Sequence, residues 1–288
     1  MGILQTCKFD RCEGCIDRGL SRRYIFIWIS AILFANQILY VYKNISLASI
    51  ETLITDLCEI GIFQYMAWYA VFRLLSLSHP DPVGCWRDLL TGAALCLLIF
   101  VPTNRMIWIA ATGIGIYIWI FNGGDLKLRG AGVVLTALSV QEFWGHNFFD
   151  LVAIPLLHAE TAVVGTMLEA TQGGTGWQEN VITGPNGHGI IIYPFCSSFH
   201  NLSLALLCWV TVSRLRYQNW QARDLVMGCI IAGTMILLNV GRLYMMALSA
   251  DLYHFWHDGT GYQIFAVGAS LTILLLSLYG LRPTARPS

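Results

Sequence analysis

The sequence predicts an all-α polytopic membrane protein of about eight transmembrane helices, with a short β-hairpin in the outer loop before the sixth helix. The chain of 288 residues is 56% hydrophobic and only 12% charged, and its mean hydropathy is +0.60. Soluble domains carry about a quarter charged residues. The chain also contains a series of apolar stretches of about 20 residues, the length that crosses the hydrocarbon core of a bilayer as a helix.

The predicted domain organisation is one transmembrane domain between two cytoplasmic tails. The tails are residues 1–23 and 282–288, and the domain is 24–281. The first apolar run has no small-residue cleavage site after it, so we expect an uncleaved span rather than a signal peptide. Zero formal net charge and the lack of a Lys/Arg-rich run argue against a nucleic-acid partner. The spans are expected near residues 24–42, 54–77, 87–102, 105–122, 131–149, 196–213, 225–249 and 261–281.

The segment 150–171 is the apolar stretch whose path differs from the others. Pro155, His158, Glu160 and Glu169 interrupt it, and we expect a re-entrant or interfacial helix that returns to the side it left. With the N-terminus inside, this topology places 14 of the 17 lysines and arginines on the cytoplasmic side, as the positive-inside rule requires. A true span here would move the last five loop and tail arginines outside.

The outer loop 172–195 is the longest soluble stretch between the predicted spans. Two β-branched runs, 181–182 and 190–192, flank a Pro-Asn-Gly turn. This pattern predicts a β-hairpin.

Cys196 follows that loop at the expected start of the sixth span. Ser197 or Ser198 is then a candidate N-cap. A helix N-terminus favours an anion, and so favours the thiolate form of a cysteine. The alternative is that Cys196 is one more small apolar filler among nine cysteines.

Asn239 and Arg242 are three residues apart in the seventh span, so they share one helix face. A buried arginine in a bilayer costs about a few kcal/mol or more, which makes Arg242 a functional candidate by default. The alternative is that its side chain snorkels to the headgroups. The neighbouring Asn239 favours a polar pocket.

The loop after the seventh span contains two histidines and two aspartates, Asp251, His254, His257 and Asp258, among aromatic residues. A neutral histidine held near a thiol serves as a general base. Incidental polar residues are common in interfacial aromatic belts, so the significance of this loop depends on what lies beside it.

Cys196, Arg242 and His257 are all expected at the outer edge of the bundle. A thiol, a fixed cation and an imidazole are the parts of a cysteine acyl-transfer enzyme. The thiolate attacks a carbonyl, the imidazole moves protons and the guanidinium holds developing negative charge.

Together these residues resemble the exosortase/archaeosortase family of integral membrane cysteine transpeptidases, over about residues 150–280. The similar segments are 186–199 around the cysteine, 239–242, which looks like the family's Asn-x-x-Arg, and 257–261, which looks like its His-x-x-x-Gly. Their order and common side of the membrane make the set more specific than each motif alone.

Two details refine the resemblance. Four residues after His254 stands Asp258 rather than glycine, so the resemblance assigns the catalytic histidine to His257. After the cysteine, the family's common form is Ser/Ala-Gly, whereas this chain has Ser197 and Ser198. The chain therefore resembles a divergent branch, and the sorting signal that it recognises stays open.

The resemblance implies proteolytic sorting at the outer, periplasmic side of the inner membrane. The substrates are secreted proteins with a C-terminal motif, a transmembrane helix and a basic tail; lipids are the other partners, and no cofactor or metal is implied. Cys196 would form a thioester, His257 would move protons, Arg242 would stabilise the oxyanion or orient the motif, and Asn239 would orient Arg242. The supporting residues are Ser197, Ser198 and His254.

A polar stripe in the fifth span leads to the main alternative. Glu142, His146 and Asp150 are spaced by four, and His158 and Glu160 lie nearby. They are candidate metal ligands of a membrane metalloenzyme or an ion-coupled transporter. A hydrogen-bonded polar seam explains the same stripe, and the internal repeats typical of a transporter are not found. A purely structural or scaffolding membrane protein is a third possibility, disfavoured by the three convergent residues.

The N-terminal tail contains a C-x4-C-x2-C cluster, Cys7, Cys12 and Cys15. A zinc site or a cluster cofactor needs a fourth ligand, and no nearby histidine supplies one. Reduced thiols and a site completed by a second chain both remain open. Cys196 has no obvious outer disulfide partner, as expected of a free reactive thiol.

Overall fold

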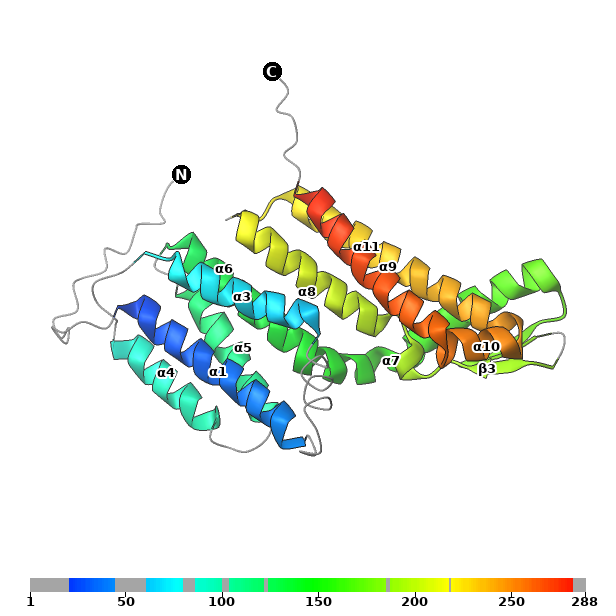
Figure 1. Cartoon of the computed structure of the whole chain (residues 1–288), viewed down its shortest axis with the longest axis horizontal. Coiled ribbons are helices and arrows are strands. Elements are labelled where there is room, and N and C mark those ends of the chain that lie inside the picture. Colours follow the sequence, from blue (N-terminus) through cyan, green and yellow to red (C-terminus); the bar gives the residue numbers. More distant parts are fainter. Residues whose placement is uncertain are drawn as a thin grey trace, which may run out of the picture.

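A computed structural model describes residues 21–44, 61–79, 86–99, 104–121, 124–184, 187–217 and 219–281. These ranges form a helical bundle with one small sheet (Figure 1). The predicted cluster of Cys7, Cys12 and Cys15 lies outside the described residues, as does the C-terminal tail. The described helices are α1 (Arg22–Asn44), α3 (Ile62–Ser76), α4 (Trp86–Ile99), α5 (Asn104–Ile120), α6 (Leu126–Ser139), α7 (Gly145–Gln172), α8 (Phe199–Arg216), α9 (Ala222–Leu248), α10 (Ala250–His257) and α11 (Thr260–Gly280).

The all-α class is confirmed, and a small sheet accompanies it. Within the described ranges, three helices are long and apolar enough to cross a membrane: Asn147–Gln172 in α7, α9 and α11. The total of eight transmembrane helices stays a prediction.

The helices run back and forth between two ends of the bundle (Figure 1). At one end, Arg22 at the start of α1 forms an ion pair of 3.1 Å with Asp88 at the start of α4, and it also donates to the carbonyl of Phe121, just after α5. At the same end, Arg223 at the start of α9 donates to the carbonyl of Gly280 at the end of α11. We call this the basic end. The opposite end of α8, α9 and α11 carries the sheet and α10, and we call it the sheet end.

Close helix packing in the first half depends on glycine. A Cβ on Gly132 of α6 would lie 2.6 Å from the carbonyl oxygen of Gly115 in α5 and 2.8 Å from the amide nitrogen of Trp119. Both contacts are with backbone, which has no rotamer with which to move away. Small residues at such crossings let two helix backbones approach, which is a main source of packing energy in membranes.

The path from α6 to α7 corrects the prediction for segment 150–171. A π-helical turn, Val140–Trp144, joins α6 to α7, and α7 then continues unbroken past Pro155 to Gln172. The predicted break at 149–150 is therefore wrong, and the chain makes no turn back within 150–171. Proline is tolerated inside apolar helices of membrane proteins. The change of direction comes earlier, at the π turn, where the hydrogen-bond pattern of the helix shifts.

The start of α6 and the end of α8 nevertheless lie at the same end of the bundle, because Arg129 and Arg214 line one small pocket. The chain therefore leaves the basic end along α6 and returns to it along α8. α7 adds no return to the basic end, and instead runs toward α10 and the sheet (Figure 1).

The sheet confirms the predicted hairpin and adds one strand to it. β2 (Val181–Thr183) and β3 (Gly189–Ile191) pair antiparallel, with Ile182 opposite Ile190. β1 (Gly176–Gln178), which was not predicted, pairs with the other edge of β2. Ile182 and Ile190 are buried in an apolar cluster with α7 and α9, so this short sheet is anchored to the bundle.

We expect Gly132→Ala to lower the free energy of unfolding by about 1–3 kcal/mol, because the new methyl group overpacks a backbone contact. The matched control is Gly233→Ala in α9, where an added Cβ meets nothing within 4 Å and the gain in helix propensity is about 1 kcal/mol at most. Unfolding by a denaturing detergent, titrated into mild detergent, measures both. Equal stability of the two variants would contradict the close crossing of α5 and α6.

Candidate active site

Cys196 ends a 3₁₀ turn, Pro194–Cys196, that connects the sheet to α8. α8 itself begins at Phe199, so the prediction that Cys196 lies at the helix N-terminus is corrected to a position three residues before it. The cysteine is 7% exposed and free of disulfide bonds. It packs in the apolar cluster that joins α7, the sheet and α9.

The two serines after the cysteine lie at the start of α8, where the sequence predicts a cap. Ser198 stands at the N-cap position, but its side chain makes no capping bond. Instead, its backbone amide donates to Oε1 of Glu160 at 2.9 Å, and its hydroxyl donates to the same oxygen. Ser197 Oγ lies 3.4 Å from that oxygen and accepts a hydrogen bond of 3.3 Å from the amide of Phe199. A carboxylate from another helix thus accepts donors at the start of α8, a favourable place for negative charge.

Glu160 also belongs to this site. The sequence had indicated it only as a candidate metal ligand. It lies in α7 and is 4% exposed. Its second oxygen, Oε2, is buried and has no hydrogen-bond partner among the residues that the structure describes. The sequence feature that could have identified it is an acidic residue within an apolar segment, since a buried carboxylate requires hydrogen-bond donors.

Asn239 holds the backbone of the cysteine. Its Nδ2 donates to the carbonyl oxygen of Cys196 at 2.9 Å, and the residue is fully buried. In the described part of the chain no hydrogen bond joins Asn239 to Arg242, so the partner of Asn239 differs from the predicted one. Asn239 Oδ1 is buried without a partner there.

Arg242, one turn further along α9, is held between α10 and α11. Its Nε and Nη2 both donate to the carbonyl oxygen of Trp256, each at 3.2 Å. The guanidinium carbon lies 4.9 Å from the ring centre of Phe265 and 5.5 Å from that of Tyr262, and Cys196 lies within range of the guanidinium charge. This is a packed position inside the protein, unlike a snorkelling side chain.

The structure distinguishes the two candidate histidines. His257, at the end of α10, stacks on Tyr253 with ring centres 4.8 Å apart, and its Nδ1 hydrogen bonds to the Asp258 carboxylate. The His254 side chain is 73% exposed, and its Nδ1 lies 3.6 Å from Oδ2 of Asp258. The hydrogen bond from His257 lowers the pKa of Asp258, and His254 contributes to the same shift. Asp258 was not predicted as a site residue, although its place next to the histidine was a signal.

Tyr253 connects the histidine to the cysteine. It packs against the apolar cluster that contains Cys196 and stacks on His257. Burial raises the pKa of Tyr253, with smaller contributions from Asp258, Cys196 and Tyr193, so its hydroxyl keeps its proton. No hydrogen bond joins Cys196 to His257 among the described residues. All three predicted catalytic residues, Cys196, Arg242 and His257, nevertheless lie at the same end of the bundle. Tyr253 stacks on His257 and Trp256 binds Arg242 there.

The polar stripe of the fifth span is not assembled as a ligand set. Glu142 lies in the π turn, which breaks the regular spacing to His146 and Asp150, and it accepts a hydrogen bond from Gln64. Asp150 and His158 are exposed, whereas Glu160 is buried. Across the described ranges, no group of three His, Cys, Asp or Glu side chains is placed to hold a metal ion. The Glu142–Gln64 bond fits the polar-seam interpretation.

Apolar spans that carry a thiol, a guanidinium and an imidazole at one end define the class, a multi-pass membrane protein with a polar site at the end of its helices. A family model of transmembrane exosortases matches residues 59–274, which is most of the chain and includes all three residues. The chain belongs to the transmembrane exosortase family. This membership supports a membrane-embedded protease or transpeptidase that acts in protein sorting. Searches of the curated proteins and of the solved structures found no match.

We expect Asn239→Leu, which keeps the side-chain volume but removes the donor to Cys196, to destabilise the protein by about 1–3 kcal/mol. It should also change the rate at which maleimide alkylates Cys196 in a variant where Cys196 is the sole cysteine. The control is Thr234→Val in the same helix, whose exposed hydroxyl donates to the Ile230 carbonyl one turn earlier. Unchanged stability together with unchanged alkylation would contradict the anchoring of the turn by Asn239.

Proposed function

We propose that this protein is a cysteine protease or transpeptidase of the cytoplasmic membrane that cleaves a C-terminal sorting signal from secreted proteins through a thioester on Cys196. The observation that supports it most is the contact chain from the cysteine turn to Asn239 and Arg242 and on to α10. The family match covers this whole region. Substrates of this class carry a motif, a transmembrane helix and a basic tail. The sheet end then lies on the outer, periplasmic side.

In the first step, the Cys196 thiolate attacks the scissile carbonyl after its proton passes to His257. The His257–Asp258 bond occupies Nδ1, so Nε2 is the atom that takes and returns the proton. Arg242 stabilises the oxyanion of the tetrahedral intermediate. When the intermediate collapses, the C–N bond breaks, His257 protonates the leaving amine and a thioester remains on Cys196.

The second step releases the acyl group. An acceptor nucleophile or water gives its proton to His257 and attacks the thioester carbonyl. The C–S bond breaks and the Cys196 thiolate returns. An amine or hydroxyl acceptor gives transfer, and water gives hydrolysis.

Two buried residues act by position. Asn239 and Glu160 hold the peptide segment on either side of the thiol, one through the Cys196 carbonyl and the other through the Ser198 amide. Pre-set geometry of this kind contributes to rate because misplacement of about 1 Å is costly.

Cys196→Ala should abolish processing of a co-expressed secreted protein that bears a motif, a transmembrane helix and a basic tail. Intact-mass analysis of the secreted protein reads out the cleavage and the cleavage site. The matched control is Cys229→Ala, which removes an exposed free thiol of α9. Hydroxylamine, which attacks thioesters, should release the acyl group as a hydroxamate from wild type only. Processing that survives in Cys196→Ala at equal expression would refute the thiol mechanism.

His257→Ala should lower the processing rate by about 10²–10⁴-fold, the usual contribution of a general acid–base residue, whereas the exposed His254→Ala should keep most of it. Asp258→Asn should cause a smaller loss than His257→Ala, because the ring stays but loses its charged partner. Since the pKa of Asp258 lies below its ordinary value, its carboxylate is ionised throughout the range from about pH 6 to 8. Any change of the loss with pH over that range therefore does not come from protonation of Asp258.

The control for Asp258→Asn is Asp251→Asn, which removes an exposed carboxylate of α10, the helix that Asp258 follows. Time courses of substrate cleavage in membranes measure all four variants. Greater sensitivity to His254→Ala than to His257→Ala would assign the proton transfer to the other histidine.

A further inference from the structure

A long apolar groove runs beside α8, on the side that faces α6 and the start of α7. Its volume is about 630 Å³. One wall is a stripe of α8 that includes Leu202, Leu206 and Val210, and the other includes Val133 and Ala137 of α6. The spacing of four residues in each set places its members on one helix face. The groove is therefore parallel to the two helices.

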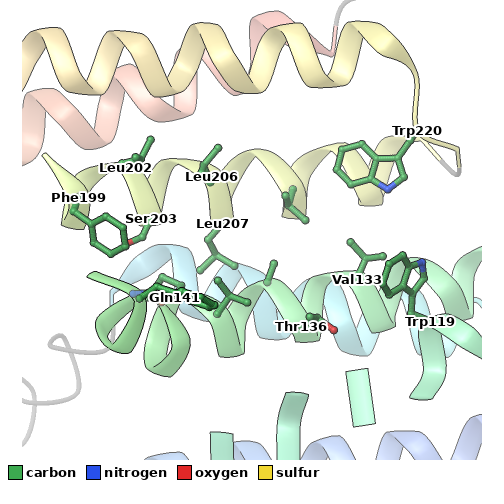
Figure 2. A pocket seen from close by; sticks show the side chains of 15 residues that line it. Trp119, Val133, Thr136, Gln141, Phe199, Leu202, Ser203, Leu206, Leu207 and Trp220 are labelled. Carbon is green, nitrogen blue, oxygen red and sulfur yellow. The ribbon is translucent and has the colours of Figure 1, made fainter. Parts of the chain in front are cut away.

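The two ends of the groove differ. Figure 2 shows Phe199 at one end, and Trp119 and Trp220 at the other. Phe199 is the first residue of α8, three residues after Cys196. Trp119 and Trp220 are both about half exposed, as is typical of tryptophans at a membrane–water interface. The groove thus extends from the active-site end of α8 to the basic end.

The tryptophan end continues into a site with positive charge. A small second pocket shares Val133 and Trp220 with the groove, and Arg129 and Arg214 also line it. The guanidinium carbon of Arg214 lies 3.9 Å from the ring centre of Trp220. An apolar groove therefore ends at two arginine side chains.

Within the described residues, the two arginines of this pocket share one paired carboxylate. Arg214 is 3% exposed and pairs with Asp224 at 3.1 Å, but its Nε is buried without a hydrogen-bond partner among the described residues. The Arg129 side chain has no hydrogen-bond or ion-pair partner in those ranges, and its charge interacts with that of Arg214. Two cations are thus close to one carboxylate, and donors on both arginines are left unbonded in the described part of the chain.

We propose that this groove is a binding site for an anionic phospholipid, with an acyl chain along α8 and the phosphate at Arg129 and Arg214. Basic pockets between transmembrane helices on the cytoplasmic side suit anionic headgroups. The apolar contacts alone give little preference for one occupant over another, since lipid tails are as apolar as leucine side chains. The charge at the groove's end supplies the selectivity, at about fivefold in affinity per arginine.

A substrate transmembrane helix is the competing occupant. Its basic tail would lie at the end of the groove where Arg129 and Arg214 stand, so like charges would meet. The phosphate of an anionic lipid meets the opposite charge there. The proposal is independent of the cysteine reaction, and a bound lipid braces α8, the helix that follows the Cys196 turn.

The test is lipid retention by the full-length protein extracted from vesicles that contain equal amounts of phosphatidylglycerol and phosphatidylcholine. Native mass spectrometry counts the lipids that stay bound. We expect phosphatidylglycerol to be retained in preference to phosphatidylcholine, and added inorganic phosphate alone not to replace it. Arg129→Gln should weaken retention about fivefold. The matched control is Arg87→Gln, which removes an exposed arginine at the start of α4, outside the groove.

A second variant keeps the test independent of the arginines. Leu206→Trp fills the groove from a position that is 39% exposed and should abolish retention while the protein stays folded. Cys196→Ala should retain phosphatidylglycerol as wild type does, which separates this site from the cleavage reaction. Equal retention of the two lipids, or equal effects of Arg129→Gln and Arg87→Gln, would overturn the proposal. So would displacement of both lipids by an apolar helical peptide with a basic tail, which would assign the groove to substrate.

Discussion

The hydrogen bonds that hold the turn before α8 are the constraint on which the rest of the site depends. In apolar surroundings a backbone carbonyl or amide must find a partner within the protein. The Cys196 carbonyl precedes α8 and so has no place in its hydrogen-bond ladder, and Asn239 of α9 supplies the donor. The Ser198 amide is in the same situation, and Glu160 of α7 supplies the acceptor. The turn is thereby tied to two helices that are far apart in the sequence.

That tie also sets the neighbours of the thiol. Because Asn239 is bonded to the cysteine backbone, the register of α9 against the turn is set, and Arg242 lies one turn further along the same helix. Arg242 then binds the Trp256 carbonyl with two donors, which positions the end of α10. His257 is the next residue. A single buried amide therefore connects the thiol, the cation and the imidazole, although they come from three separate segments.

The sequence was sufficient for features that follow from local pattern. Hydropathy predicted the helical membrane class, and the β-branched runs around a Pro-Asn-Gly turn predicted the pairing of β2 with β3. The spacing of Asn239 and Arg242 correctly placed them on one face of α9. These features depend on periods of two and of 3.6 residues, which are read directly from the chain.

Features that depend on partners in space were missed. The π turn at Val140–Trp144 changes the helical period, so the four-residue spacing of Glu142, His146 and Asp150 carried no information about a shared face. Glu160 was visible only as an acid in an apolar segment, because its donors come from a turn more than thirty residues later. Asn239 was paired with its helix neighbour rather than with the cysteine backbone. In each case the nearest residue in sequence was not the partner in the fold.

Arg242 has enough hydrogen-bond donors to hold α10 and to stabilise the proposed oxyanion at the same time. A guanidinium has five N–H donors, and the Trp256 carbonyl accepts from only two of its nitrogens. Donors therefore remain for an oxyanion while α10 stays in place. This matters because α10 has no buried residue of its own, so it depends on contacts such as this one to stay at the sheet end with His257. An arginine that had to release Trp256 in order to bind the oxyanion would loosen the histidine at the moment of proton transfer. Sharing the guanidinium between the two avoids that conflict, and lysine, with a single ammonium point charge, would lack the geometry to do so.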